Sequence, residues 1–170
     1  MINQVDVIIR DSLGDFVSEV TRSLWKGRER EAISLYAFGF LQRYITADGV
    51  LRDTTQIGIE VTVPSDKAVN PKGRVAKDLV LWAEPKMTCW DQNWRVTNFP
   101  LAIMEWKVYR LPSRKAVVSN KDTEWLLYYS KYCPSAFVGY AISLDLIDQE
   151  FRINVTRGEG GSVQERRLVL

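Results

Sequence analysis

Histidine is absent from the 170 residues of this chain. Without an imidazole, Ser-His-Asp and Cys-His hydrolysis are excluded, and a zinc site is disfavoured. The two cysteines, Cys89 and Cys133, are far apart in the sequence and form no CxxC motif, so we interpret both as reduced thiols. Chemistry near neutral pH must therefore depend on carboxylates, lysine, tyrosine or a hard metal ion.

Long apolar runs and a strong net charge are missing too. No stretch reaches the roughly 18 apolar residues of a membrane-spanning helix, and residues 1–6 lack the basic start and apolar run of a secretory signal. We therefore expect a cytoplasmic protein without a membrane segment. The net charge is only +2, so no overall positive field indicates nucleic acid as a partner.

The composition that is present is typical of one soluble domain. Hydrophobic residues make up 46% of the chain and charged residues 26%, which predicts a single domain over residues 1–170. Spaced apolar residues predict an amphipathic helix within the first 25 residues, interrupted near Gly14, and a second helix over 27–45. The stripe expected on the second helix consists of Glu31, Leu35, Phe38, Gln42 and Ile45.

Beyond residue 50 the apolar spacing becomes typical of strands. The elements predicted there are strands over 57–63, 79–82 and 101–109, a helix that begins near Asn120 and ends before Pro134, a strand over 136–144, and a closing hairpin of 151–155 and 167–170. The predicted fold class is therefore α/β. It has a central mixed β-sheet flanked by helices, with an extra N-terminal helix and a C-terminal hairpin.

Charged residues interrupt the two most apolar of these strands. Asp78 directly precedes the run Leu79–Trp82, and Glu105 and Lys107 lie within 101–109. Side chains alternate along a strand, so Glu105 and Lys107 are expected on the same face. Burying an unpaired charge costs several kcal/mol or shifts its pKa until it is neutral, so these charges need an explanation.

A divalent metal ion is one explanation. Successive strands tend to be neighbours and lie about 4.8 Å apart, so Asp78 and Glu105 can share a cation. Mg²⁺ or Mn²⁺ fits oxygen ligands of this kind, and the backbone carbonyl of Trp106 can add one more. Lys107 could then position a metal-bound water, help to deprotonate it, or neutralise charge on a phosphate.

The motif Asp78…Glu105-Trp106-Lys107, within the order helix, three strands, helix, strand, resembles the PD-(D/E)XK nuclease superfamily with its restriction-endonuclease-like fold. The resemblance covers roughly residues 27–156. It implies that Asp78 and Glu105 bind magnesium, that Lys107 assists hydrolysis, and that phosphodiester bonds are cut.

Two further features of the family pattern can be compared with this chain. Many members have an acid on the preceding helix, for which Glu31 is the candidate here. Lys77 stands in the place of the family's proline. The resemblance favours DNA over RNA as the substrate, and a homodimer would allow one small domain to cut both strands of a duplex.

Two basic connections are candidate nucleic-acid contacts, although ordinary solvated loops have the same composition. Their residues are Lys72, Arg74, Lys77, Arg110, Arg114 and Lys115. Trp90 and Trp94 lie in a mixed aromatic segment over 84–99. They are interpreted as packing residues, with stacking on unpaired bases as the alternative.

The site residues also have structural interpretations. Glu105 and Lys107 could form an inert ion pair, Asp78 could meet water or Lys77 at a strand edge, and Glu31 could pair with Arg28. Two functional hypotheses follow. The first is a metal-dependent nuclease that uses a metal-activated water. The alternative is a catalytically inactive restriction-endonuclease-like domain that acts as a nucleic-acid-binding or protein-interaction module.

Overall fold

A mixed β-sheet lies between helices in the computed structural model, which describes residues 2–66, 72–109, 120–133, 136–147, 150–159 and 162–168. The helices are α1 (Ile2–Arg22), α2 (Glu29–Gly39) and α3 (Asn120–Tyr132), with short 3-10 turns at Leu41–Tyr44 and Thr54–Gln56. The strands are β1 (Ile57–Pro64), β2 (Arg74–Leu81), β3 (Ala102–Tyr109), β4 (Val138–Ile147), β5 (Glu150–Glu159) and β6 (Ser162–Leu168). The predicted α/β class and element order are confirmed.

The strand order in the sheet is β1-β2-β3-β4-β5-β6, so every strand pairs with its neighbours in the sequence. All pairs are antiparallel except β3 and β4, which are parallel. A parallel pair needs a long crossover, and α3 lies within the connection between these two strands. The C-terminal hairpin is the antiparallel pair of β5 and β6.

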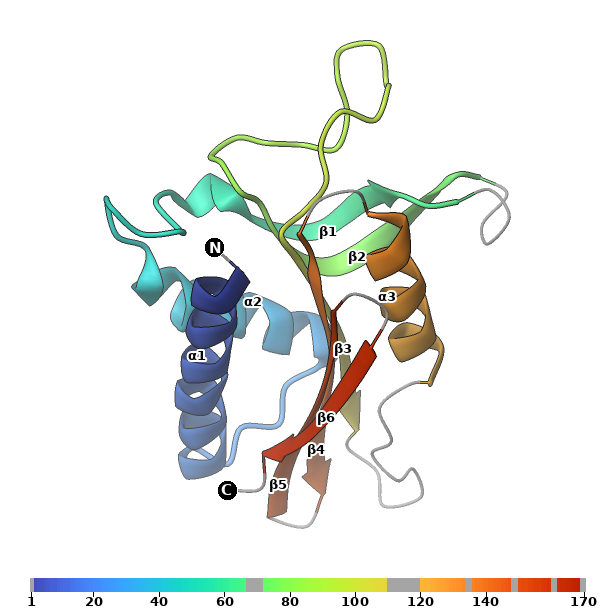
Figure 1. Cartoon of the computed structure of the whole chain (residues 1–170). Helices are drawn as coiled ribbons and strands as arrows, with labels where there is room; N and C mark the ends of the chain where they lie inside the picture. Colours follow the sequence, from blue (N-terminus) through green and yellow to red (C-terminus); the bar gives the residue numbers. More distant parts are fainter. Residues whose placement is uncertain are drawn as a thin grey trace.

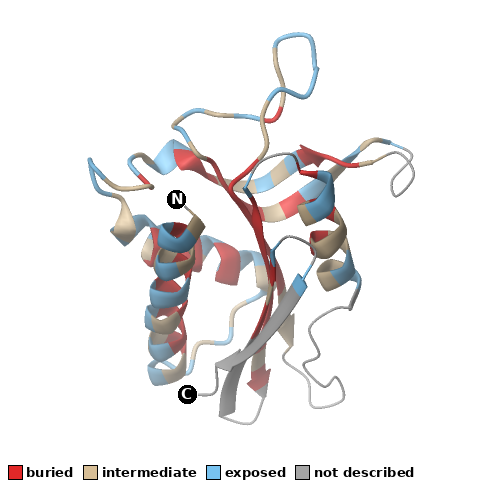
Figure 2. Cartoon of the chain, in the orientation of Figure 1, coloured by how far each residue is buried: buried red, intermediate tan, exposed pale blue. Residues whose placement is uncertain are grey.

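Helices cover both faces of the sheet. In Figure 1, α1 and α2 lie on one side of the sheet and α3 on the other. The core on the α1 and α2 side contains Phe16, Tyr36 and Trp106, whose rings pack with centroids 5.1–5.8 Å apart. The core on the α3 side includes Ile103 and Tyr129. Burial is concentrated along the central strands β3 and β4 and the inner side of α1 (Figure 2), which agrees with a central position for the strand at 101–109.

The second predicted helix was wrong in its end and in its buried face. α2 ends at Gly39 and a 3-10 turn follows, whereas the prediction continued to residue 45. The buried residues of α2 are Ala32, Ile33, Tyr36 and Ala37. The predicted stripe is not the core face, because Glu31 is exposed and Phe38 is 55% exposed. Both sets have helical spacing, and only packing on the sheet distinguishes them.

The N-terminal helix is continuous through Gly14, where an interruption was predicted. We expect Gly14→Ala to raise the free energy of unfolding by about 0.5–1 kcal/mol, because alanine has a lower entropic cost in a helix interior. A Cβ added at Gly14 would meet nothing within 4 Å. Chemical denaturation measures the change. Gly139→Ala is the matched control and should destabilise, since its Cβ would lie 2.9 Å from Leu126 Cδ2.

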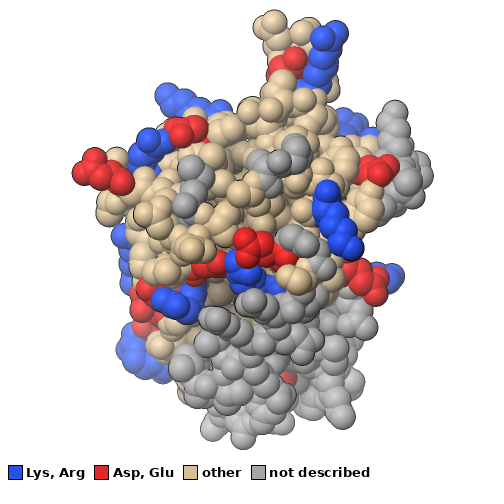
Figure 3. Space-filling view, in the orientation of Figure 1, with Lys and Arg blue, Asp and Glu red and all other residues tan. Residues whose placement is uncertain are grey.

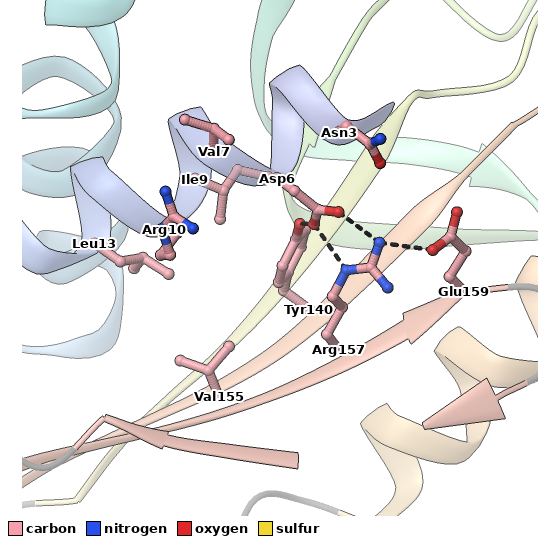
Figure 4. Close-up of a pocket in the computed structure, with 10 residues that line it drawn as sticks. All are labelled: Asn3, Asp6, Val7, Ile9, Arg10, Leu13, Tyr140, Val155, Arg157 and Glu159. Atoms are coloured by element: carbon pink, nitrogen blue, oxygen red, sulfur yellow. Dashed lines mark hydrogen bonds and ion pairs between the residues drawn. The ribbon is translucent and has the colours of Figure 1, made fainter. Parts of the chain in front are cut away.

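An ion-pair network attaches α1 to the sheet (Figure 4). Arg157 on β5 donates to the Asp6 carboxylate from Nε at 2.8 Å and from a terminal nitrogen at 2.5 Å, and it also donates to Glu159 at 2.7 Å. The Tyr140 hydroxyl donates to Asp6 as well. These contacts lie beside a cavity of about 390 Å³ between α1 and the sheet. The charges of Arg157 and Asp6 pair with each other across the contact between β5 and α1, so this network orients the helix on the sheet.

Among the described residues, no helix combines the length and the apolar character that crossing a bilayer requires.

Candidate functional site

The sheet divides between β2 and β3. Their pairing covers only Leu79↔Met104 to Leu81↔Ala102, while β2 stays paired with β1 as far as Arg74 and β3 stays paired with β4 as far as Tyr109. Beyond the pair Leu79↔Met104 the two strands separate, so that residues 74–78 of β2 and 105–109 of β3 no longer pair with each other. Figure 1 shows β1 and β2 running across the view while β3 and β4 run down it. We call the space between residues 74–78 and 105–109 the fork.

The backbone of Trp106 faces into the fork. Asp78 Oδ2 accepts a hydrogen bond from the Trp106 amide at 2.7 Å, and Lys107 Nζ donates to the Trp106 carbonyl at 2.7 Å. These side chains replace the strand pairing that the backbone loses where the ladder ends, because an unpaired buried amide would be costly. The Trp106 ring is fully buried in the core on the α1 and α2 side, which fixes the position of its peptide groups.

Glu105 is buried beside a lysine. Its side chain is 7% exposed and forms an ion pair with Lys77, whose side chain is 6% exposed. The Lys77 ammonium also lies 3.4 Å from the centroid of the Trp125 ring on α3. Burial raises the pKa of Glu105 to about 7 even though Lys77 acts in the opposite direction, and Asp78 adds to the rise. Glu105 therefore titrates near neutral pH.

A break in β1 explains why Lys77 meets Glu105. Ile59 pairs with Leu79 and Val61 pairs with Lys77 in the β1–β2 ladder. Glu60, between them, has no partner residue in this ladder, and its backbone has a φ of 53°. Ile59 packs on the α1 and α2 side and Val61 on the α3 side, so the hairpin changes faces at this point. Regular alternation would place Lys77 on the face of Leu79. Sequence reasoning assumed that alternation and therefore missed the role of Lys77.

The acid contributed by α2 is Glu29 rather than Glu31. Glu29 Oε1 lies 3.5 Å from Lys107 Nζ, and both side chains are a little over one third exposed. Glu31 is exposed, and its carboxylate accepts a hydrogen bond from the backbone amide of Arg28 at 2.5 Å, at the start of the helix. An acid three residues into a helix commonly caps it in this way, which is the signal that could have separated the two.

Asp122, in the first turn of α3, brings a fourth carboxylate within electrostatic reach of the fork. Burial lowers the pKa of Lys107, but the carboxylates around it more than compensate and the net pKa is raised. They are Glu29, Asp78, Asp122 and Glu105, in decreasing order of effect. Lys107 is therefore protonated at neutral pH. It can donate hydrogen bonds and neutralise negative charge, but it is a poor base.

The fork offers the donor set of a hard cation, namely the carboxylates of Asp78 and Glu105 and the carbonyl of Trp106. The three are adjacent, since the strand register beyond Leu79↔Met104 leads to Asp78 and Glu105. One oxygen of each group already accepts a hydrogen bond: Glu105 Oε1 from Lys77, Asp78 Oδ2 from the Trp106 amide, and the Trp106 carbonyl from Lys107. Within the part of the chain that the structure describes, no cluster of three or more acidic or thiol ligands is preassembled. A bound cation would therefore either displace Lys77 from Glu105 Oε1 or bind the other oxygen of that carboxylate.

The predicted nucleic-acid contacts separate into three groups. Lys72 and Arg74 are exposed on the β1–β2 hairpin. Lys77 is buried, so the structure does not place it among the surface cations. The remaining three, Arg110, Arg114 and Lys115, lie outside the described residues. Acidic and basic side chains are interleaved across the middle of the visible face (Figure 3).

Comparison with protein-family models, with curated proteins and with solved structures finds no match. The assignment of a function therefore depends on the residues of the fork and their geometry.

Proposed function

We propose that this protein is a divalent-metal-dependent nuclease that hydrolyses phosphodiester bonds. DNA is the proposed substrate in preference to RNA. The observation that carries the proposal is the gathering of Asp78, Glu105 and Lys107 around the Trp106 backbone at the fork. Buried charges at a break in a sheet are costly, and charged groups with perturbed pKa values cluster at functional sites. Membership of the PD-(D/E)XK superfamily and its restriction-endonuclease-like fold belong to the same proposal, supported by the motif and the element order.

Asp78 and Glu105 would hold Mg²⁺ or Mn²⁺, together with the Trp106 carbonyl. A bound ion of this kind supplies a nucleophilic water at neutral pH and stabilises the charge on the phosphate. The buried ring of Trp106 keeps the carbonyl in place, and the two carboxylates come from neighbouring strands, directly beyond the last pair of their ladder. This arrangement orients the ligands without the help of a mobile loop.

Lys107 would act as a cation in this mechanism. Its raised pKa keeps it protonated at neutral pH, so it can orient the attacking water by a hydrogen bond and neutralise charge that develops on the phosphate. Glu29 lies 3.5 Å from its ammonium group and would hold it in position. Glu105 is the group whose ionisation changes near pH 7, and its charged form is the one that binds a metal ion.

The experiment that tests this function is a cleavage assay with plasmid, single-stranded DNA and RNA, in Mg²⁺, Mn²⁺ or a chelator. We expect cleavage with the metal ions and none with the chelator. Lys107→Met should lower the rate by about 10²–10³-fold, because it removes a charge that stabilises the transition state. Lys131→Met, at an exposed position on α3, is the matched control and should cleave normally. Cleavage that persists in Lys107→Met would contradict the proposal.

The buried ion pair favours a second function, that of a non-catalytic nucleic-acid-binding domain. Lys77 already provides Glu105 with a cation that is almost fully buried. If that cation is permanent, calorimetry with Mg²⁺ or Mn²⁺ should detect no binding at the fork. The assay above should then detect no cleavage, while nucleic acid would still bind in the presence of a chelator.

A further inference from the structure

A groove of about 1090 Å³ lies between the β1–β2 hairpin and the segment that joins β2 to β3. In Figure 1 this segment rises above the sheet beside the hairpin. The groove residues that carry the inference are two threonines, two cations and two indoles. They are Thr62, Lys72, Arg74, Thr88, Trp90 and Trp94.

Trp94 is presented to solvent by a tightly bonded turn. It is 75% exposed, the highest value among the exposed large hydrophobic residues of the described chain, and its φ of 58° is a conformation that bulky residues rarely adopt. The Asp91 side chain accepts hydrogen bonds from the amides of Asn93 and Arg95, each at 2.8 Å. The Trp94 amide donates to the Asp91 carbonyl at 3.0 Å.

Trp90 connects the two walls of the groove. Its indole nitrogen donates to the carbonyl of Thr62 on β1 at 3.2 Å, and its backbone forms a bridge with Val96. The segment that carries Trp94 is therefore anchored to the hairpin that carries Lys72 and Arg74. The aromatic segment is thereby tied to β1, which pairs with the strand that carries Arg74.

The charge of the groove indicates an anionic ligand. Lys72 and Arg74 line the groove and are exposed, so they can meet the phosphates of a ligand that lies there. A flat exposed indole beside two cations matches a nucleotide, whose base stacks while its phosphate meets the cations. In a duplex the bases are already stacked on one another, so an accessible base requires a single strand.

We propose that this groove binds a single-stranded segment of nucleic acid, with a base stacked on Trp94 and the backbone phosphates beside Lys72 and Arg74. This inference deepens the proposed function, on which it rests for the class of partner. Arg74 is on the same strand as Lys77 and Asp78, so a strand held in the groove would lie close to the fork.

The test is fluorescence anisotropy of the whole chain with a labelled deoxythymidine oligomer of about 12 nucleotides, in a chelator so that no cleavage occurs. We expect the oligomer to bind more tightly than a duplex of the same length. Trp94→Ala should weaken binding about 10-fold, and Trp94→Tyr should retain most of the affinity. Phe38→Ala, which removes another exposed ring, should bind as the unchanged protein does.

Two further measurements separate stacking from charge. An abasic oligomer lacks the base that would stack on Trp94. Its affinity for the protein without a substitution should therefore be as low as the affinity of the deoxythymidine oligomer for Trp94→Ala. Replacing Lys72 and Arg74 together with alanine should reduce the slope of log affinity against log salt by about 0.7 for each lost phosphate contact. Replacing Arg22, an exposed arginine on α1, should not.

The inference is overturned if the oligomer does not bind, if the duplex binds as tightly, or if Trp94→Ala and the abasic oligomer leave the affinity unchanged. The nuclease proposal is tested separately, by measuring metal-dependent cleavage by Glu105→Gln and by the protein without a substitution. Normal binding by a protein that never cleaves would count against the nuclease and leave the groove in place.

Discussion

Glu105→Gln is expected to lower metal-dependent cleavage by about 10²–10³-fold. Glutamine has the shape of glutamate, and its amide oxygen can still accept the hydrogen bond from Lys77. The buried Lys77 charge loses its counter-charge, so chemical denaturation of the variant is measured alongside its activity. The negative charge that would bind the cation is lost. Cleavage rates and calorimetric titration with Mn²⁺ measure the two effects. Glu84→Gln, at an exposed glutamate that pairs with Arg52, is the matched control.

The pH dependence of the unchanged protein gives a second readout of the same residue. Burial raises the pKa of Glu105 to about 7, so the carboxylate becomes charged as the pH rises through that value. The cleavage rate and the affinity for metal should therefore both increase between about pH 6 and pH 8. A flat profile over this range, or normal cleavage by Glu105→Gln, would exclude Glu105 as a ligand.

Lys77→Met is expected to lower the free energy of unfolding by about 3–5 kcal/mol, because it leaves the Glu105 carboxylate buried without a partner. Replacing both residues, as Lys77→Met with Glu105→Leu, should restore most of the loss, since a buried apolar pair needs no compensating charge. Chemical denaturation of the two single variants and the double variant forms a double-mutant cycle. Equal losses in Lys77→Met and in the double variant would contradict the ion pair.

The pH dependence of this loss has a defined sign. Burial holds the pKa of Glu105 at about 7 in the folded protein, above its usual 4.5, so folding retains a proton and stability falls as the pH rises between these values. Without Lys77 the folded-state pKa rises further. The variant therefore continues to lose stability above pH 7, where the unchanged protein does not. The difference between them should be larger at about pH 9 than at about pH 6.

The order of the elements was predictable because local patterns determine it. The change from helical to alternating apolar spacing near residue 57 separates the helices from the first strand, and Pro64 and Gly73 flank the turn between β1 and β2. The face of α2 was not predictable. Its stripe through Phe38 and its buried set around Tyr36 have the same period, and only contact with Phe16 and Trp106 selects the second.

The candidate site was also predictable only in part, because local sequence patterns indicate some of its residues and tertiary packing selects the others. Asp78, Glu105 and Lys107 were identified because acids and a lysine in apolar strands are unusual wherever the strands lie. The choice of Glu31 was made by spacing along a helix, and the structure instead brings Glu29 to Lys107. Two residues of difference on a helix turn a side chain by about 200°, so the contact depends on how α2 is placed against β3.

The sequence by itself determined the chemistry that is available to this protein. It has no histidine, and it places carboxylates and lysines inside its most apolar segments. Only the tertiary structure decided which charge meets which. Lys77 and Glu105 are 28 residues apart, and their contact depends on the positive φ of Glu60 and on the early end of the β2–β3 ladder. Backbone twist and strand divergence arise from packing between distant segments, and no local pattern of residues encodes them.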